Sequence, residues 1–434
     1  MKIARIQLQN FRGVREMDLE LNARLTVLIG KNGEGKTTLL DALALPLSDV
    51  FREPPLWRHK ERSGVKNADI FHGEKTARIR IFLEPLEVSA PADFDLKIAR
   101  DAAAGIDEPA RVELVKSSRV HAMEQRLHED AATAGSLLAI RYVPQRHFSA
   151  QSVEPLSHDL LTPKSAYYSA LEGGKGRQFL NWLRKRQHDE LLKLDVPWHE
   201  ALDMLRRDEC PPGADPHLFA ARRAIAEFVG VKALHHAEKA FLVYKDEYPL
   251  SVQPLSDGEK RLLVLVGDLT RRLSATHPHL TESDQLLAEA EAVVMIDEME
   301  LHLHPTWQRS VVPRLKKTFP NVQFILTTHS PQVLGEIASE SLMLLEETSD
   351  GIQARHFARE VHGLSSGEIL EALMETPERT FQVEQELNGA YEAIERGDLQ
   401  RAKELLAALT ATAKDVPELE RLSMRIRRKE AVGR

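Results

Sequence analysis

The sequence predicts an α/β fold with a parallel sheet at its centre, and three observations lead to this prediction. Residues 25–29 form a short apolar stretch rich in β-branched side chains, which is typical of a buried strand. A glycine-rich segment, 30–38, follows it directly, and an apolar helical pattern follows over 39–45. From residue 255 onward, helix and strand patterns alternate, which favours a parallel sheet with helices on its faces.

Composition limits the class of protein. A length of 434 residues allows two or three domains, and a net charge of −8 argues against a basic nucleic-acid coat, although a local basic groove is still possible. Cys210 is the only cysteine, so neither an intramolecular disulfide nor a Cys-pair zinc site can form. The N-terminus lacks the apolar stretch of a signal peptide, and no run of 18 apolar residues occurs. We therefore expect a cytoplasmic protein with no membrane span.

Changes of pattern along the chain divide it into four parts. We expect a β-rich lobe over 1–120, a helical insertion over 121–250, an α/β lobe over 251–350 and a helical region over 351–434. Period-two alternation predicts strands in the first part at 2–9, 14–21, 76–83 and 111–116. A further strand is expected at 137–143, inside the insertion. The last part should contain helices at 366–374, 381–396 and 399–409.

The segment Gly30–Thr38 matches the pattern G-x-x-x-x-G-K-[ST]. Its glycines let successive backbone N–H groups turn into one concavity, which suits a phosphate at the start of a helix. Lys36 should reach the β- and γ-phosphates, and the Thr37 hydroxyl should face Mg²⁺. An ordinary glycine-rich turn is the alternative, but the strand before the segment and the helix after it favour a nucleoside triphosphate site. The loop residues assigned to ATP are Asn32, Gly33, Gly35, Lys36, Thr37 and Thr38.

A second motif is the apolar stretch Val293–Glu298, which ends in two acids. In an enzyme with a phosphate loop, the first acid, Asp297, holds Mg²⁺, and the second, Glu298, polarises the attacking water. The alternative is a strand that ends in a solvated acidic turn. Because the phosphate loop is also present, we prefer the catalytic interpretation.

The segment Leu255–Arg261 places a serine hydroxyl and a glycine amide at a helix start, where they can receive a γ-phosphate. It can also be a capping box, in which Ser256 or Asp257 caps the helix and Glu259 completes the box. The two interpretations are compatible, because a motif that receives phosphate in this way is itself the start of a helix.

These motifs together resemble an ABC-type ATPase head, a kind of P-loop NTPase. Leu-Ser-x-Gly-Glu resembles the ABC signature, and Thr327–Ser330 resembles the switch-histidine segment, in which His329 would sense the γ-phosphate. Gln145, after Tyr-Val-Pro, resembles the glutamine that contacts Mg²⁺ in that family. The motifs occur in the family's order between residues 10 and 330.

Two further stretches narrow the resemblance. Ile6–Gly13 is similar to the opening of the RecF and SMC group, in which the arginine, here Arg12, reaches the nucleotide. Met299–Arg309 resembles the Leu-His-Pro-x-Trp-Gln version of the OLD-like ATPases and of the Septu-type and retron-associated defence ATPases. His302 and His304 could instead form a metal pair, but a loop at the ATP interface is favoured, since no suitable further ligand lies nearby in the sequence.

The same comparison indicates what this chain lacks. About 215 residues separate the phosphate loop from the signature without sustained heptads, which predicts a compact helical insertion instead of a coiled coil. A zinc hook would need a cysteine pair. Leu344–Asp350 faintly resembles the first acidic motif of a Toprim nuclease domain, but the glycine and the Asp-x-Asp motif of that domain are missing. We therefore expect an AAA-family ATPase of the OLD-like group without a nuclease site of its own.

The resemblance implies a mechanism and partners. ATP and Mg²⁺ would be the cofactors, with Thr37, Gln145 and Asp297 around the metal and Glu298 and His329 as the catalytic pair. A second copy would supply the signature in trans, through Ser256, Gly258 and Glu259, so a homodimer or larger homo-oligomer is expected. In the Septu-type systems the ATPase works with a separate HNH endonuclease, so a similar nuclease partner is expected here.

Three other functions stay open at this stage. A DNA repair or chromosome-maintenance ATPase of the RecF/SMC kind is the first alternative, and an autonomous OLD-type nuclease or a transporter ATPase is a weaker one. DNA or another nucleic acid is a candidate partner, for example through the basic runs Arg184–Arg186 and Arg425–Lys429. Such runs are more often solvated helix faces.

Overall fold

The computed structural model describes most of the chain, in ranges separated by short gaps. These ranges are 2–48, 65–85, 91–100, 105–129, 138–144, 163–167, 170–171, 176–237, 240–245, 248–357, 361, 364–374, 381–412 and 418–432. The chain divides into two compact units, Met1–Gly363 and Leu364–Arg434, which are described separately below. Within the described ranges we find no helix with the length and apolarity needed to cross a bilayer.

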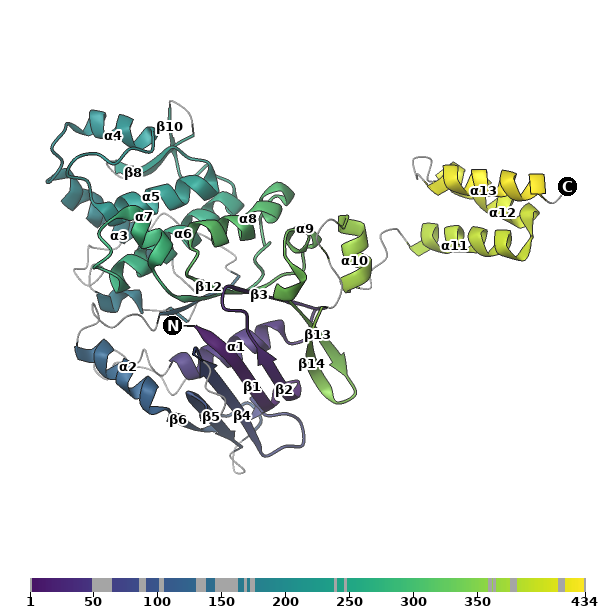
Figure 1. Cartoon of the computed structure of the whole chain (residues 1–434), viewed down its shortest axis with the longest axis horizontal. Helices are drawn as coiled ribbons and strands as arrows, with labels where there is room; N and C mark the ends of the chain where they lie inside the picture. Colours follow the sequence, from purple (N-terminus) through teal and green to yellow (C-terminus); the bar gives the residue numbers. More distant parts are fainter. Residues whose placement is uncertain are drawn as a thin grey trace. The chain divides into compact units, whose positions relative to one another are not determined.

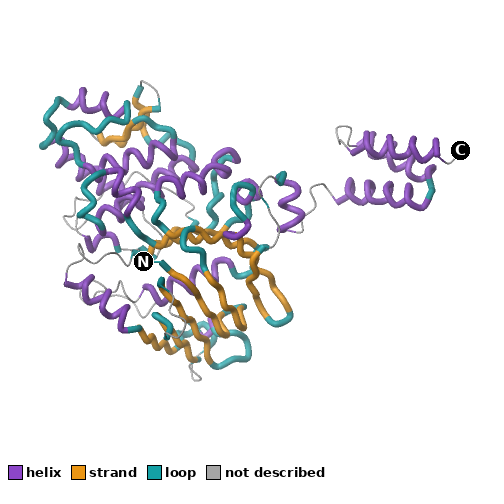
Figure 2. The backbone as a smooth tube through the Cα atoms, viewed as in Figure 1, coloured by secondary structure: helices purple, strands orange, loops and turns teal. Residues whose placement is uncertain are grey.

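In the described part of the first unit, a six-stranded sheet has the order β14-β13-β3-β12-β11-β7 (Figures 1 and 2). Neighbouring strands are parallel, except that β14 runs antiparallel to β13. The strands are β3 Leu25–Ile29, β7 Ala139–Tyr142, β11 Val293–Ile296, β12 Gln323–Thr327, β13 Leu342–Thr348 and β14 Gly351–His356. Because β3, β11 and β12 are parallel, the segments that follow them meet at one edge of the sheet.

A second, antiparallel sheet with the order β2-β1-β4-β5-β6 lies on one side of this central sheet. Its strands are β1 Ile3–Phe11, β2 Val14–Glu20, β4 Thr76–Leu83, β5 Phe94–Ala99 and β6 Arg111–Lys116. Helix α1 (Lys36–Ser48) joins the two sheets, because one hydrophobic cluster includes Ile6 of β1, Leu43 of α1 and Ile325 of β12. The phosphate loop therefore leads into a helix whose apolar residues are held by both sheets.

Helices cover the other side of the central sheet, and Figure 1 shows α5, α6 and α8 there. They span α5 Pro216–Val229, α6 Asp257–Thr276 and α8 Pro305–Thr318. Nearly all residues of α6 are buried, as expected of a helix surrounded by packed elements. Further helices of this unit are α2 Ser118–Glu129, α7 Ser283–Glu289 and α9 Pro331–Leu334, with short 3-10 turns at Asn67–Asp69, Pro163–Ala166 and Ser339–Ser341.

A fully buried ionic cluster ties α6 to β7. Asp268 accepts hydrogen bonds from Arg271 at 2.8 Å and from Arg272 at 2.7 Å, and all three side chains are inaccessible to solvent. Tyr142, the last residue of β7, donates its hydroxyl to Asp268 at 3.1 Å. Burial, and then the charge of Asp268, raise the pKa of Tyr142, so this hydroxyl stays protonated and able to donate. The cluster links the helix that begins at the signature to the strand that precedes Gln145 in the sequence.

The region between β7 and the signature contains a small sheet as well as helices. Helices α3 (Gly176–Leu191) and α4 (Trp198–Arg206) precede α5, and antiparallel strands follow it in the order β10-β9-β8. These strands are β8 Ala233–Ala237, β9 Ala240–Tyr244 and β10 Pro249–Ser251. The insertion that was predicted to be helical therefore contains a small sheet as well as helices.

His235 of this small sheet makes the fold sensitive to acid. Its ring is buried, stacks on Tyr244 and has no hydrogen-bond partner at Nδ1. Burial, and then the charges of Arg222 and His236, lower the pKa of His235 to about 4. Above pH 6.5 the ring is neutral in both the folded and unfolded states, and on acidification the unfolded state takes up the proton first. Stability is therefore lost as the pH falls from 6.5 toward 4.

We expect a change from pH 7.5 to pH 5 to lower the free energy of unfolding by about 2 kcal/mol through this ring. The variant His235→Phe keeps an aromatic ring against Tyr244 but cannot titrate. Denaturant unfolding at the two pH values should show a smaller pH-dependent loss for this variant than for the wild type. Equal losses for the two proteins would contradict the assignment to His235.

The second unit is helical. Its helices are α10 Ser366–Met374, α11 Phe381–Arg396, α12 Leu399–Thr412 and α13 Glu418–Val432. Helices α11 and α12, both predicted from the sequence, form a hairpin around Gly397, which has the positive φ of +83° that glycine adopts readily at a helix end. A small core containing Ile394, Ala402 and Leu422 joins α11, α12 and α13.

The predicted α/β fold class is confirmed: the described residues form a parallel central sheet, an antiparallel β lobe and a helical C-terminal unit. Strands β5 and β14 and helices α4, α7 and α13 were not predicted. The four-part division at residues 120, 250 and 350 remains a prediction, whereas the structure separates its units after residue 363.

Candidate functional site

The phosphate loop connects β3 to α1, and Lys36 is the first residue of that helix. Its ammonium group points back into the loop, where Nζ donates to the carbonyl oxygen of Gly30 at 2.7 Å and to that of Lys31 at 2.6 Å. Burial lowers the pKa of Lys36, while nearby acids, Glu34 first, act to raise it. A desolvated cation held inside the loop is well placed to meet a phosphate group.

Two glycines in the loop are required by its shape. Gly33 and Gly35 have φ values of +91° and +85°, which side-chain-bearing residues rarely adopt. At Gly35, an added Cβ would also lie 2.9 Å from the side chain of Ile352 in β14. Asn32 and Gly33 are exposed and Thr38 is half-buried, so this face of the loop is open to a ligand.

Asp297 lies at the end of β11, between two threonine hydroxyls. The hydroxyl of Thr37 in the phosphate loop donates to Asp297 Oδ2 at 3.1 Å, across 260 positions of the chain. The hydroxyl of Thr327, at the end of β12, donates to Oδ1 at 2.6 Å. The structure thus brings together Thr37 and Asp297, two of the three residues that the sequence assigned to Mg²⁺.

Glu298 begins a turn with unusual backbone geometry. Its φ is +49°, in the left-handed region, and that of His302, at the other end of the turn, is +64°. The N–H of Glu298 donates to the Thr327 hydroxyl at 2.8 Å, so one threonine bonds both acids. The turn directs the chain away from the sheet immediately after the predicted base.

His329 follows β12 and lies at the same edge of the sheet. Its backbone N–H donates to Glu300 Oε1 at 2.7 Å, while Glu300 Oε2 is buried without a hydrogen-bond partner. Burial, and then the charge of Lys36, lower the pKa of His329. Its ring is therefore neutral near pH 7, and a neutral imidazole can still donate one hydrogen bond to a γ-phosphate.

The signature forms a capping box, as predicted. Ser256 caps α6, with its side chain accepting from the N–H of Glu259 at 3.3 Å, and Glu259 accepts from the N–H of Ser256 at 2.8 Å. Glu259 also forms an ion pair with Lys245. At Gly258, an added Cβ would lie 2.5 Å from the carbonyl oxygen of His302, so the signature and the acidic turn meet backbone to backbone.

Arg12 was predicted to contact the nucleotide, and Gln145 its metal ion. Arg12, in the turn after β1, has a φ of +50°, forms an ion pair with Asp41 of α1 and donates to Asp69 at 2.8 Å. The Arg12 guanidinium is thus next to the helix that follows the phosphate loop. In the part of the chain that the structure describes, its ion-pair partners are the carboxylates of Asp41 and Asp69. Gln145 lies outside the described residues.

The histidines of the Leu-His-Pro stretch have separate positions. His302 is exposed in the acidic turn, and the side chain of His304 caps α8 by accepting from the N–H of Thr306. Across the ranges that the structure describes, no group of three or more His, Cys, Asp or Glu side chains is arranged to hold a metal ion. Gln308 of the same stretch bonds Ser330, which joins this loop to the His329 segment.

Several residues in the site were not predicted from the sequence. Thr327, Glu300, Lys245 and Arg261 all contact predicted site residues. Thr327, Glu300 and Arg261 are all part of the motifs described from the sequence, which indicates that they lie near the site but not what they contact. Lys245 and Arg261 act on residues 14 and about 40 positions away, and no local pattern reveals such contacts.

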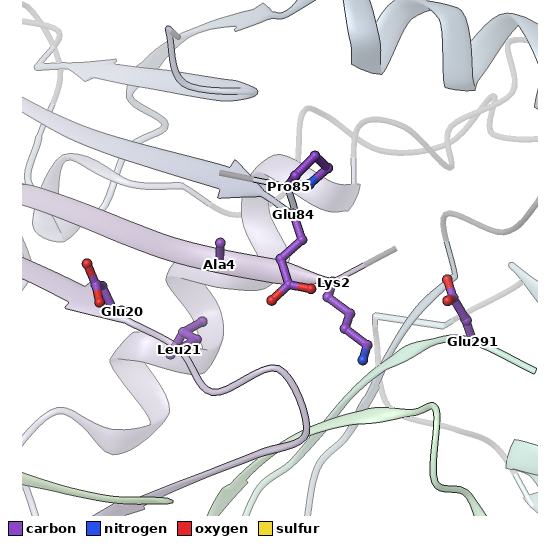
Figure 3. A pocket seen from close by; sticks show the side chains of 7 residues that line it. All are labelled: Lys2, Ala4, Glu20, Leu21, Glu84, Pro85 and Glu291. Atoms are coloured by element: carbon purple, nitrogen blue, oxygen red, sulfur yellow. The ribbon is translucent and has the colours of Figure 1, made fainter. Parts of the chain in front are cut away.

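The hollow shown in Figure 3 is a different place on the molecule. It has a volume of about 720 Å³ and is lined by Lys2, Ala4, Glu20, Leu21, Glu84, Pro85 and Glu291. Glu291 precedes β11, so this pocket lies near the amino-terminal end of that strand, whereas Asp297 follows its carboxyl end. The lining has three glutamates and one lysine, so its net negative charge would repel a polyphosphate.

A phosphate loop, two acids and a histidine at the carboxyl edge of one parallel sheet define the class: a P-loop ATPase of the ABC type. The chain belongs to the family described as "AAA domain, putative AbiEii toxin, Type IV TA system", whose model matches residues 25–335. That span includes the loop, the signature, both acids and His329.

The chain is also similar to two retron ATPases and a Septu protein. The chain is 26% identical to the Retron Ec83 probable ATPase of Escherichia coli, over 87% of this chain and 77% of the relative. It is 26% identical to the Retron Vc95 probable ATPase of Vibrio cholerae, over 88% and 81% respectively. It is also 24% identical to the Septu protein PtuA of Bacillus mycoides, over 79% of this chain and 40% of that protein.

Proposed function

We propose that this protein is an ATP-driven switch in which two copies close around ATP. The observation that supports it most directly is the contact of Thr37 with Asp297 at 3.1 Å, because it joins the phosphate loop to the acidic motif. Lys36 and the loop amides would bind the phosphates, with Asn32 and Thr38 at the open face. Glu298 would activate water, and His329 would couple hydrolysis to movement.

The donor set around Asp297 fits Mg²⁺. A carboxylate and a threonine hydroxyl are hard oxygen ligands, and Mg²⁺ in nucleotide sites is commonly held by one or two protein oxygens together with phosphates and waters. Thr37 and Asp297 would hold the ion, with Gln145 as a further candidate. When bound, the ion would neutralise charge on the phosphates, while Glu298 orients the water and Lys36 holds the γ-phosphate.

The second half of the site would come from another copy. Ser256 and Glu259 are bonded to each other at the start of α6, and Gly258 faces the acidic turn of its own chain. In ABC-type heads, which this chain resembles, the signature meets the phosphate loop of a partner subunit. Ser256, Gly258 and Glu259 would therefore close over the partner's γ-phosphate, with ATP holding the dimer together.

The proposed role of this switch is antiphage defence, as the subunit that controls a separate HNH-type nuclease. Similarity to Septu and retron ATPases supports the defence assignment. The nuclease partner is inferred from the resemblance to Septu-type systems. DNA-stimulated hydrolysis without any nuclease partner would favour the repair or chromosome-maintenance alternative instead.

A mixing experiment tests the composite site. Ser256→Arg should inactivate the signature, and Glu298→Gln should inactivate the base, so each variant alone should hydrolyse ATP poorly. In a mixed dimer, one site combines the intact base of the first chain with the intact signature of the second. Mixing equal amounts should restore activity, up to about a quarter of the wild-type rate, since half the dimers carry one good site of two. A mixture as inactive as its components would contradict sharing between copies.

A further inference from the structure

The side chain of Arg261, in α6, donates hydrogen bonds to the backbone of the acidic turn, residues 297–302. Its Nη1 donates to the carbonyl oxygen of Leu301 at 2.7 Å, and its Nη2 donates to that of Glu298 at 2.8 Å and that of Asp297 at 3.3 Å. A planar guanidinium suits this arrangement, because its donors form a rigid fork that can reach several acceptors at once. One side chain therefore bonds both the predicted metal ligand and the predicted base through their main chain.

The turn that Arg261 holds is conformationally strained. Glu298 and His302, at its two ends, have φ values of +49° and +64°, and neither is a glycine. Residues with side chains rarely adopt such angles, and where they do, the surrounding structure has to impose them. Arg261 and the Thr327 hydroxyl are the groups that bond the backbone of Glu298 from outside the turn.

The same helix touches the turn at a second point. The first turn of α6 lies so close to His302 that a Cβ at position 258 would approach its carbonyl oxygen to 2.5 Å. The signature backbone and the far end of the acidic turn are thus in direct contact. A displacement of the α6 start would be passed to the turn at both Gly258 and Arg261.

We propose that Arg261 is a positioning residue that couples the signature to Glu298. The inference rests on the proposed function, in which Ser256 and Gly258 receive the γ-phosphate of a partner. Arg261 lies about one turn farther along the same helix and holds the carbonyl of the base. Closure of the signature on the partner's nucleotide would therefore improve the position of Glu298 in its own chain, and hydrolysis in one site would be faster when the other site is closed.

The test compares binding with turnover in Arg261→Ala and Arg261→Lys. Lysine keeps the positive charge but has no planar fork, so it cannot bond the same three carbonyls together. We expect both variants to bind Mg-ATP with wild-type affinity, because the phosphate loop is untouched, while kcat falls by about 100-fold. Arg314→Ala is the matched control: Arg314 also donates to backbone carbonyls, those of Glu227 and Phe228, but on α8 away from the acids. It should keep the wild-type kcat.

A double-mutant cycle separates positioning from a general structural role. If Arg261 acts through Glu298, then Arg261→Lys combined with Glu298→Gln should be no slower than Glu298→Gln alone. A further loss of rate in the double variant, or a loss of nucleotide affinity equal to the loss of kcat, would overturn the proposal. Wild-type turnover in Glu298→Gln alone would instead overturn the proposed function, because Glu298 would not be the base.

Discussion

Replacing Glu298 with glutamine is expected to abolish turnover while preserving ATP binding. Glutamine keeps the size of the side chain but cannot accept the proton from water, and loss of a general base costs about 10²- to 10⁴-fold in rate. Lys36, Thr37 and Asp297 are unchanged, so the nucleotide should remain bound. Because hydrolysis would open the dimer, the variant should accumulate as an ATP-bound dimer in size-exclusion chromatography with light scattering.

Glu336→Gln provides the control for this experiment. Glu336 is an exposed glutamate just after α9, in the segment that follows His329. It carries the same chemical change without touching the acidic turn, so its ATPase rate and its elution should match the wild type. Normal hydrolysis by Glu298→Gln would show that the base is a different residue.

Replacing Lys36 with alanine is expected to remove ATP binding itself. Its Nζ already lies within hydrogen-bond distance of two loop carbonyls and would exchange them for phosphate oxygens. Loss of one or two hydrogen bonds to a charged partner corresponds to a Kd at least about 100-fold higher. Isothermal titration with a slowly hydrolysed ATP analogue and Mg²⁺ would measure this change directly.

Lys317→Ala is the matched control for Lys36. This lysine is exposed on α8 and is 3.5 Å from Glu227, far along the chain from the loop. Its removal tests for non-specific effects of lost positive charge on nucleotide affinity. If Lys36→Ala bound ATP as tightly as Lys317→Ala, the glycine-rich segment would not be the phosphate site.

The parts of the fold that were predictable are those with strong local signals. The buried apolar strand at 25–29, the glycine-rich turn and the acid-ended strand each follow from a few adjacent residues. Helix α5 has ends of the same local kind: Asp215 and Pro216 mark its start and Gly230, with φ at +70°, marks its end. Local chemistry decides such boundaries, so tertiary packing had little to alter.

The parts that were not predicted depend on contacts between distant segments. Helix α7 is short, at residues 283–289, and is stabilised chiefly by packing against α5. In the site, the partnership of Arg261 with Glu298 exists only because α6 lies against the acidic turn. Arg12 was identified by its motif, but its partners were not. The motif suggested a nucleotide contact, while the fold pairs Arg12 with Asp41 and Asp69. Sequence identifies chemically able residues more easily than it identifies their partners.

The order of strands in the central sheet also constrains how the protein is made. Strand β3 comes from the first 30 residues, yet its sheet neighbours β12 and β13 come from beyond residue 320. The side chain of Gln323 further bonds the backbone of Ile3, across 320 positions. During synthesis, the phosphate loop therefore leaves the ribosome long before the strands that support it. Contacts of such long range slow folding, so a chain interrupted before residue 323 would carry the loop without a working nucleotide site.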